Sequence, residues 1–347
     1  MAENGRIAVV GTGSWGATLA IVLARHGRTV RLLARTPEEA EILLSEGENR
    51  RFLPGVPFPL QLTVTADPEL ALHDASIVLV AVPAKTMREN IRALREFLPD
   101  HAVILSCAKG LEQGTLLRMS EVIAEELPEG CPVTPGALSG PNLAPEIAAG
   151  KPATTVVAAW SDEAAQCAQQ VLSTPLLRVY TSSDLIGVEL GGALKNIIAL
   201  GAGIADGMGA GDNAKSAFIT RGLAEIARLG SALGANPLTF AGLAGLGDLV
   251  ATCTSPLSRN RRLGEAIARG KSLESALREL GHVAEGVGTI VAARDIAARH
   301  AVEMPITEEL YRILFMGKSA REAIIDLMSR EPKDELHGIA TLLQQRR

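Results

Sequence analysis

A single lysine, Lys195, interrupts the long apolar run from Gly187 to Met208. Apolar residues fall on every side of this run, which predicts a buried helix rather than a surface helix. Burial lowers the pKa of a lysine and makes the group a usable acid or base near neutral pH. Lys195 is therefore a candidate proton donor. The alternative is a lysine that extends its ammonium to solvent or pairs with Glu189 or Asp206.

The same run carries an unusual number of glycines, Gly191, Gly192, Gly201 and Gly203. A glycine inside a helix costs about 1 kcal/mol of stability relative to alanine. We therefore expect something to approach the backbone of this helix closely, either a ligand or another domain.

A glycine-rich turn, GTGSWG, follows the strand-like segment Arg6 to Val10 and precedes an apolar helix that reaches Arg25. A strand, a GxGxxG turn and a helix in this order predict a dinucleotide site. Gly11, Gly13 and Gly16 would allow a tight turn and close approach of a pyrophosphate to backbone N–H groups at the helix N-terminus. The alternative is a glycine-rich turn that binds nothing.

Arg35 follows a second strand-like segment, Thr29 to Ala34, at the position where an NAD site carries an acidic residue for the ribose hydroxyls. An arginine at this position suits the 2′-phosphate of NADP instead, so we favour NADP over NAD. The alternative is that Arg35 stacks on the adenine and tolerates both cofactors.

Other cations stand where anions could bind. Lys109 follows the apolar segment Val103 to Ala108, and ligands gather at the carboxyl ends of parallel strands. Ser258 can cap a helix that begins with Arg259 and Asn260, so that backbone amides, the helix dipole and a guanidinium converge as a phosphate site requires. The alternative is an ordinary helix start whose arginines are solvated.

Two acidic residues lie in short turns of the second half of the chain. Asp248, in a glycine-rich segment, either caps a helix or orients a buried cation. Glu285, in the turn VAEG, is placed to reach a ligand.

Strands and helices alternate in the first half, which predicts an α/β fold with a Rossmann-type doubly wound sheet. Further strands are expected at 77–82, 103–108, 152–159 and 178–181. Residues 136–150 are expected to form a turn-rich loop that leads into a helix. This alternation then stops, and the sequence of the second half of the chain predicts an all-helical C-terminal domain. We expect a dinucleotide-binding domain over 1–184 and a helical substrate-binding domain over 185–347.

Composition narrows the classes of function. The 347 residues are 47% hydrophobic and carry a net charge of −5, which argues against nucleic acid as a partner. The four cysteines and six histidines are scattered, which predicts reduced thiols and no metal site. No signal-like N-terminus and no uncharged apolar run of about 18 residues is seen, so we expect a cytoplasmic protein without a membrane span.

These residues resemble the NAD(P)-dependent glycerol-3-phosphate dehydrogenases, specifically the bacterial biosynthetic form. The resemblance covers nearly the whole chain through GTGSWG, LSGPNLAPEIAAGKPA, GVELGGALKNIIALGAGIADGMGAGDNAKSAFITRG, GLGDLVATCTSPLSRNRRLG and VAEGVGT. It implies reversible hydride transfer between NAD(P)H and the C2 carbon of dihydroxyacetone phosphate, which gives sn-glycerol 3-phosphate for phospholipid backbones.

The resemblance also implies roles for single residues. Lys195 is the proton donor and acceptor, and Asp248 is its catalytic neighbour. The residues implied to line the cofactor, besides the three glycines of the turn, are Ser14, Trp15, Arg35, Lys109, Ala144, Arg259, Val283 and Glu285. The residues implied to meet the substrate are Lys109, Gly140, Asn142, Lys195, Asp248, Ser258, Arg259 and Asn260.

Two other functions remain open at this point. A related two-domain dehydrogenase of hydroxy acids would keep the nucleotide motif and the lysine. A redox sensor would bind NADPH without turnover. Helical second domains of this kind often associate, and we expect a homodimer that acts on a small phosphorylated substrate.

Overall fold

The structure, a computed structural model, describes residues 6–281 and 284–335. The chain forms two compact units. The first comprises Met1–Ala108 and Leu117–Leu185, and the second comprises Lys109–Leu116 and Ile186–Arg347. The short segment Lys109–Leu116 thus belongs to the second unit although the first unit surrounds it in sequence. Each unit is described by itself.

The first unit is built on one eight-stranded sheet with the order β3-β2-β1-β4-β5-β6-β7-β8. Neighbouring strands are parallel except β6 and β7, which are antiparallel. The order of the first six strands is that of doubly wound nucleotide-binding sheets. The strands are β1 Arg6–Val10, β2 Val30–Leu33, β3 Leu62–Thr65, β4 Ala75–Val80, β5 Val103–Ser106, β6 Thr134–Ser139, β7 Ala153–Ala159 and β8 Leu177–Ser182.

Helices cover both faces of this sheet. Successive side chains of a strand point to opposite faces, and apolar side chains are buried on each face. Ile7 and Val9 join one core with helices α1, α2, α6 and α7, whereas Ala8 and Val10 join another with α3, α4 and α5. The α/β doubly wound prediction is confirmed. The helices are α1 Ser14–Arg25, α2 Pro37–Glu46, α3 Pro68–Leu72, α4 Met87–Leu94, α5 Met119–Glu126, α6 Ala144–Ala148 and α7 Asp162–Leu172, with 3₁₀ turns η1 Ala84–Thr86 and η2 Arg95–Phe97.

Two strands differ from the sequence prediction. The short strand β3 was not expected, and β6 occupies a segment whose second part was expected to be a loop. Pro135 and Gly136 are turn-forming residues, and they conceal β6 in the sequence. A side chain at Gly136 would place its Cβ 2.6 Å from the carbonyl oxygen of Ala158 on β7, so this strand pair needs glycine there.

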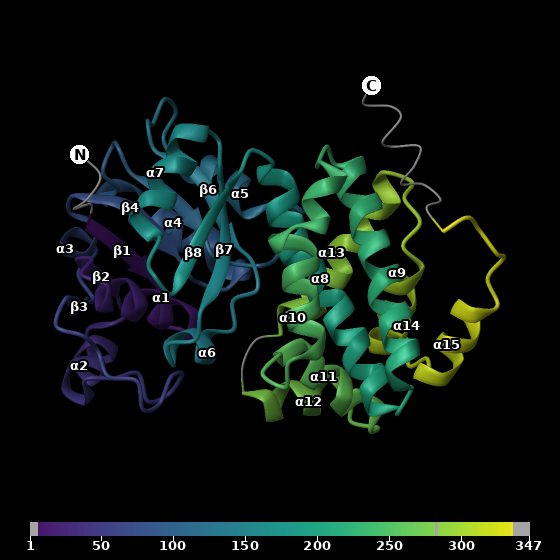
Figure 1. Ribbon diagram of the computed structural model, residues 1–347. Helices are drawn as coiled ribbons and strands as arrows, with labels where there is room; N and C mark the ends of the chain where they lie inside the picture. The colour runs from purple at the N-terminus through teal and green to yellow at the C-terminus, as the bar shows by residue number, and fades with distance from the viewer. Residues whose placement is uncertain (1–5, 282–283, 336–347) are drawn as a thin grey trace. The chain divides into compact units, whose positions relative to one another are not determined.

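The second unit contains only helices as regular elements within its described residues 186–281 and 284–335, as predicted, and these helices run alongside one another as a bundle (Figure 1). The buried helix around Lys195 is confirmed as α8. The helices are α8 Leu185–Gly207, α9 Gly211–Ala232, α10 Asp248–Thr254, α11 Arg259–Ala268, α12 Leu273–Leu280, α13 Glu285–Arg299, α14 Pro305–Phe315 and α15 Ala320–Met328, with a 3₁₀ turn η3 Pro237–Ala241 and a π-helical turn η4 Leu243–Gly247.

The glycines of α8 allow close packing of helices within the second unit. A Cβ at Gly203 would lie 1.9 Å from the carbonyl oxygen of Arg261, and one at Gly191 would lie 2.6 Å from that of Ala244. We expected a ligand or the other domain at these glycines. The close neighbours are instead backbone groups of the same unit, which fixes the position of α8 against α11 and η4.

By length and composition, α8 is the one helix of the described chain that could cross a membrane, but 89% of its most apolar stretch is buried within the structure. Such burial is typical of the core helix of a globular unit.

Candidate active site

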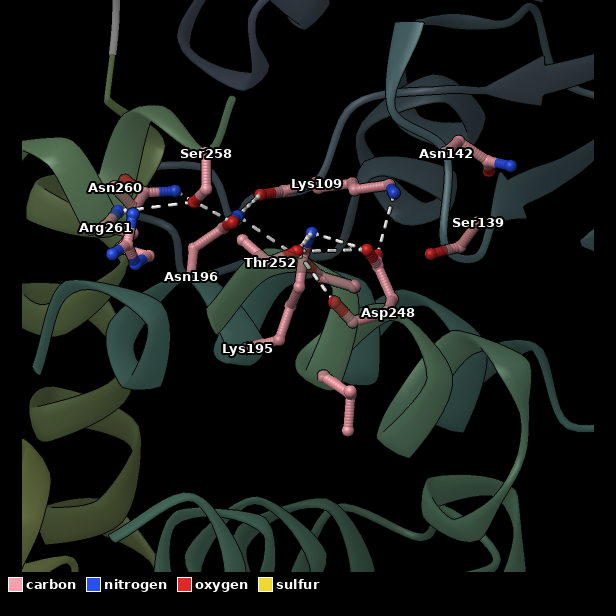
Figure 2. A network of polar contacts seen from close by, with 12 residues as sticks. Lys109, Ser139, Asn142, Lys195, Asn196, Asp248, Thr252, Ser258, Asn260 and Arg261 are labelled. Carbon is pink, nitrogen blue, oxygen red and sulfur yellow. Dashed lines mark hydrogen bonds and ion pairs between the residues drawn. The ribbon is translucent and has the colours of Figure 1, made fainter. Parts of the chain in front are cut away.

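Lys195 and Asp248 form a buried ion pair inside the second unit (Figure 2). The Nζ of Lys195 donates to Oδ1 of Asp248 at 2.6 Å, and the Nζ of Lys109 donates to Oδ2 at 2.7 Å. Each carboxylate oxygen therefore holds one lysine. Of the two alternatives for Asp248, the structure supports the one in which the carboxylate orients a buried cation. Lys195 does not pair with Asp206, which binds Lys215 and Arg261 instead.

A threonine completes the surroundings of the Lys195 ammonium. The Nζ of Lys195 lies 2.5 Å from Oγ1 of Thr252, and the Thr252 hydroxyl lies 2.7 Å from the carbonyl oxygen of Asp248 (Figure 2). Because the hydroxyl proton goes to that carbonyl, its oxygen can accept from the ammonium. An ammonium has three N–H donors. Two point to Asp248 and Thr252, and the third has no partner among the residues that the structure describes.

The same contacts determine the charge states of the cluster. Burial lowers the pKa of Lys195 to about 8, an effect that Asp248 opposes and Lys109 reinforces. Burial would raise the pKa of Asp248, but Lys109 and Lys195 together hold it below its usual value. The cluster thus contains a persistent carboxylate and a lysine that can exchange its proton near neutral pH.

Two asparagines connect this cluster to the starts of α11 and α13. Asn196 donates from Nδ2 to the carbonyl oxygen of Lys109 at 3.0 Å, and its Oδ1 accepts from Nδ2 of Asn260 at 2.9 Å. Oδ1 of Asn260 in turn accepts from the backbone N–H of Gly286 at 3.1 Å. The side chain of Asn260, predicted to meet the substrate, therefore already has two protein partners.

Ser258 caps α11 as predicted, because its Oγ accepts from the backbone N–H of Arg261 at 3.3 Å. Arg261 is not solvated, since it pairs with Asp206 at 2.6 Å and with Glu265 at 2.8 Å. Arg259, the first residue of the helix, is exposed and has no ion-pair partner among the residues that the structure describes. The helix start therefore presents the unpaired guanidinium of Arg259 beside backbone amides, which suits a phosphate.

The glycine-rich turn of the first unit has a shape that fits a dinucleotide. Gly11 has φ 103°, and a Cβ at Gly16 would lie 2.0 Å from the carbonyl oxygen of Gly11, so both glycines are needed for the turn itself. A Cβ at Gly13 would meet nothing within 4 Å, so the space beside this residue is open to a ligand. Gly13 caps α1 without a side-chain acceptor, which leaves backbone N–H groups for a pyrophosphate.

Other predicted residues of the first unit lie near the carboxyl ends of strands. Arg35 is exposed just beyond β2, and Gly140 follows β6 directly with φ 142°. The Asn142 amide donates to the carbonyl oxygen of Thr154 at 3.0 Å and so braces the turn after β6 against β7. Nε1 of Trp15 is buried and has no hydrogen-bond partner within the described ranges. Ser14 and Ala144 are the first residues of α1 and α6.

Two residues that the sequence reasoning did not assign belong to the cluster, Thr252 and Asn196. Thr252 stands four residues after Asp248, so both face the same side of α10, a spacing that the sequence contained. Asn196 follows Lys195 in an otherwise apolar run. Glu285 is the first residue of α13, and Val283, also predicted to line the cofactor, lies outside the described residues.

Comparison with known proteins decides the family. Residues 6–165 match the family model described as NAD-dependent glycerol-3-phosphate dehydrogenase N-terminus, and residues 184–325 match the corresponding C-terminus. The chain belongs to this family. The resemblance inferred from the motifs is thereby confirmed.

Relatives of the dehydrogenase family match the chain over nearly its full length. A protein of Moorella thermoacetica named glycerol-3-phosphate dehydrogenase [NAD(P)+] is 50% identical over 332 residues, which cover 96% of this chain and 98% of the relative. One of Chlorobium limicola with the same name is 50% identical and covers 95% and 99%. The crystal structure of glycerol-3-phosphate dehydrogenase from Coxiella burnetii is 38% identical, with a TM-score of 0.89 over 94% of this chain and 99% of that chain.

Proposed function

We propose that the protein reversibly reduces dihydroxyacetone phosphate to sn-glycerol 3-phosphate with NADPH or NADH, and that the product serves glycerophospholipid synthesis. The observation that carries this proposal is the buried Lys195, paired with Asp248 and with a pKa near 8, in a chain of the glycerol-3-phosphate dehydrogenase family. The first domain, 1–184, would bind the dinucleotide, and the second, 185–347, would bind the substrate.

Lys195 acts as the general acid in the direction of reduction. Its third N–H donates to the carbonyl oxygen of the substrate and transfers a proton to it as negative charge develops there. Lys195 is left as a neutral amine and recovers a proton from solvent. Asp248 holds the ammonium in place through Oδ1, and Thr252 fixes its direction. In the reverse direction the neutral amine accepts the proton of the alcohol.

Fixed positive charge binds the substrate's phosphate. Arg259, at the start of α11, offers a guanidinium fork beside the backbone amides of the helix N-terminus. Ser258 and Asn260 flank Arg259 and are proposed to contact the substrate as well. Lys109 adds a second charge close to Lys195, because both lysines share Asp248. Gly140 and Asn142 of the first unit are proposed as further substrate contacts.

The residues of the glycine-rich turn fit the cofactor. When bound, reduced NADP or NAD supplies the hydride. Gly11 and Gly16 shape the turn, and the N-terminal amides of α1 hold the pyrophosphate. The other residues that we propose to contact the cofactor are Gly13, Ser14, Trp15, Arg35, Lys109, Ala144, Arg259, Val283 and Glu285.

The experiment that tests this function mixes the purified protein with dihydroxyacetone phosphate and NADPH and follows the absorbance of the reduced nicotinamide. We expect a loss of absorbance that depends on the phosphorylated substrate. A loss only with keto acids would indicate a hydroxy-acid dehydrogenase. No loss with any ketone, despite NADPH binding by fluorescence, would indicate a sensor that binds the cofactor without turnover.

We further propose a cytoplasmic location and a homodimer. The four cysteines are unpaired, as in a reducing compartment. Exposed apolar side chains of α15, Ile324, Ile325 and Met328, support association between copies. Light scattering coupled to size-exclusion chromatography measures the molar mass directly, and a monomeric mass would reject the dimer.

A further inference from the structure

The end of β2 carries a carboxylate that the local sequence pattern conceals. In nucleotide-binding sheets an acidic residue after the second strand binds the ribose hydroxyls of NAD, whereas a nearby arginine accommodates the 2′-phosphate of NADP. In this chain Arg35 stands two residues beyond the end of β2, and the first acidic residues after the strand, Glu38 and Glu39, lie in helix α2.

Glu39 reaches back from α2 to the end of β2. Its Oε2 accepts from the backbone N–H of Arg35 at 2.9 Å, and its Oε1 accepts from the hydroxyl of Thr12 at 2.7 Å. Thr12 lies between the first two glycines of the glycine-rich turn. The carboxylate thus joins the end of the second strand to the turn proposed to bind the pyrophosphate, and both contacts lie inside the first unit.

The local structure of α2 fixes this carboxylate in place. Thr36 caps the helix and accepts from the backbone N–H of Glu39 at 3.2 Å, and Pro37 begins the first turn with a restricted φ. Glu39 therefore sits on a rigid helix start rather than on a loose loop.

The carboxylate keeps binding capacity after these contacts. Two carboxylate oxygens offer about four acceptor positions, and Thr12 and Arg35 use one position on each oxygen. A ribose hydroxyl can still donate to this group. A 2′-phosphate at the same place would meet a like charge, which is unfavourable. The Arg35 guanidinium is exposed, has no partner in the described part of the chain, and attracts the phosphate.

We propose that Glu39 is a specificity-determining residue for the cofactor. Its carboxylate accepts the 2′-hydroxyl of NADH and opposes the 2′-phosphate of NADPH, while Arg35 acts in the opposite direction. The balance between the two side chains lets one site use both cofactors. This inference rests on the proposed dehydrogenase function for its kinetic test, but not for its binding test.

The kinetic test replaces Glu39 by glutamine and compares kcat/KM for NADPH and NADH with dihydroxyacetone phosphate. Loss of a charged acceptor should shift the NADPH to NADH ratio about tenfold toward NADPH. The matched control is Glu38→Gln, which removes the same charge from the neighbouring exposed residue and should leave the ratio unchanged. Equal losses for both cofactors in Glu39→Gln, or an equal shift in Glu38→Gln, would overturn the inference.

A second variant separates the effect of the Glu39 charge from the support that Glu39 gives to the glycine-rich turn. Thr12→Val removes the hydroxyl that holds Oε1 but keeps the carboxylate, so both cofactors should weaken alike and the ratio should stay near the wild-type value. If Thr12→Val shifts the ratio as far as Glu39→Gln does, Glu39 acts only by bracing the turn and the inference fails.

The binding test uses nucleotide fragments without a nicotinamide. Calorimetric titration with 5′-AMP and with adenosine 2′,5′-bisphosphate should show that Glu39→Gln weakens the first and tightens the second. This result in a protein that does not reduce dihydroxyacetone phosphate would reject the proposed reaction and support the role of Glu39. Fragment affinities that change in parallel, in a protein that does reduce the ketone, would reject Glu39 alone.

Discussion

The Nζ of Lys195 lies 2.6 Å from Oδ1 of Asp248, while the other oxygen of the same carboxylate holds Lys109. Two cations therefore share one buried anion. With both lysines protonated the cluster carries one positive charge, which favours an anionic ligand, while burial lowers the pKa of Lys195. In the proposed reaction, binding of the substrate and proton transfer would thus depend on the same three side chains.

Replacing Lys195 by alanine should remove the general acid. We expect turnover to fall by about 10²–10⁴, the usual contribution of general acid–base catalysis, while NADPH binding measured by fluorescence changes little. Lys215→Ala is the control, because Lys215 also pairs with a partly buried aspartate of the same unit, Asp206. Lys195→Ala enzyme with most of its turnover would refute the assignment.

The pH dependence should have opposite signs in the two directions. Reduction needs the protonated ammonium, so its kcat/KM should fall as pH rises through about 8, the pKa of Lys195. Oxidation needs the neutral amine and should rise through the same range. Both profiles are measured by the absorbance of the reduced nicotinamide in overlapping buffers.

Asp248→Asn tests the origin of this pKa. Asp248 raises the pKa of Lys195 against the effect of burial, so its neutralisation should move the falling limb of reduction to lower pH. Circular dichroism verifies that the variant is folded. An unmoved limb in a folded variant would show that another group sets the profile.

Arg259 should bind the phosphate of the substrate. Truncating one partner of a desolvated charge pair typically costs about 2–5 kcal/mol, so Arg259→Ala should lower kcat/KM for dihydroxyacetone phosphate by roughly 10²–10³. Arg259→Lys keeps the charge without the fork and should recover part of the loss. The comparison substrate is dihydroxyacetone, and the control variant is Arg262→Ala, an exposed arginine of the same helix. Equal loss with both substrates would assign Arg259 to the cofactor.

Gly203 should be essential for stability rather than for chemistry. A Cβ there would lie 1.9 Å from the carbonyl oxygen of Arg261, so Gly203→Ala must push α8 and α11 apart. Overpacking of this kind costs about 1–3 kcal/mol of unfolding free energy. Thermal unfolding measures the loss, with Ala205→Ser on the same helix as a control of similar size. An unchanged melting temperature would show that the two helices are not held together at this point.

The sequence predicted those features that have a local pattern. The strand, glycine turn and helix around Gly13 and the apolar helix around Lys195 follow from spacing alone. β6 was not predicted because Pro135 and Gly136 are typical of a turn. Gly136 is instead required by the close approach of the neighbouring strand β7. Contacts between distant segments had no local signal: the partner of Lys195 lies 53 residues away, and Glu39 reaches backward to Thr12 across 27 residues.

The assignment of Lys109–Leu116 to the second unit has a consequence for how the protein can be made. Leu111 is buried in the helical core, and Lys109 bonds to Asp248, 139 residues later in the chain. During synthesis this segment is completed long before its partners exist, and such long-range closure slows folding. Expression of residues 1–184 alone should therefore leave the segment Lys109–Leu116 uncovered and give an aggregation-prone fragment. A single cut in the gene does not separate the two units.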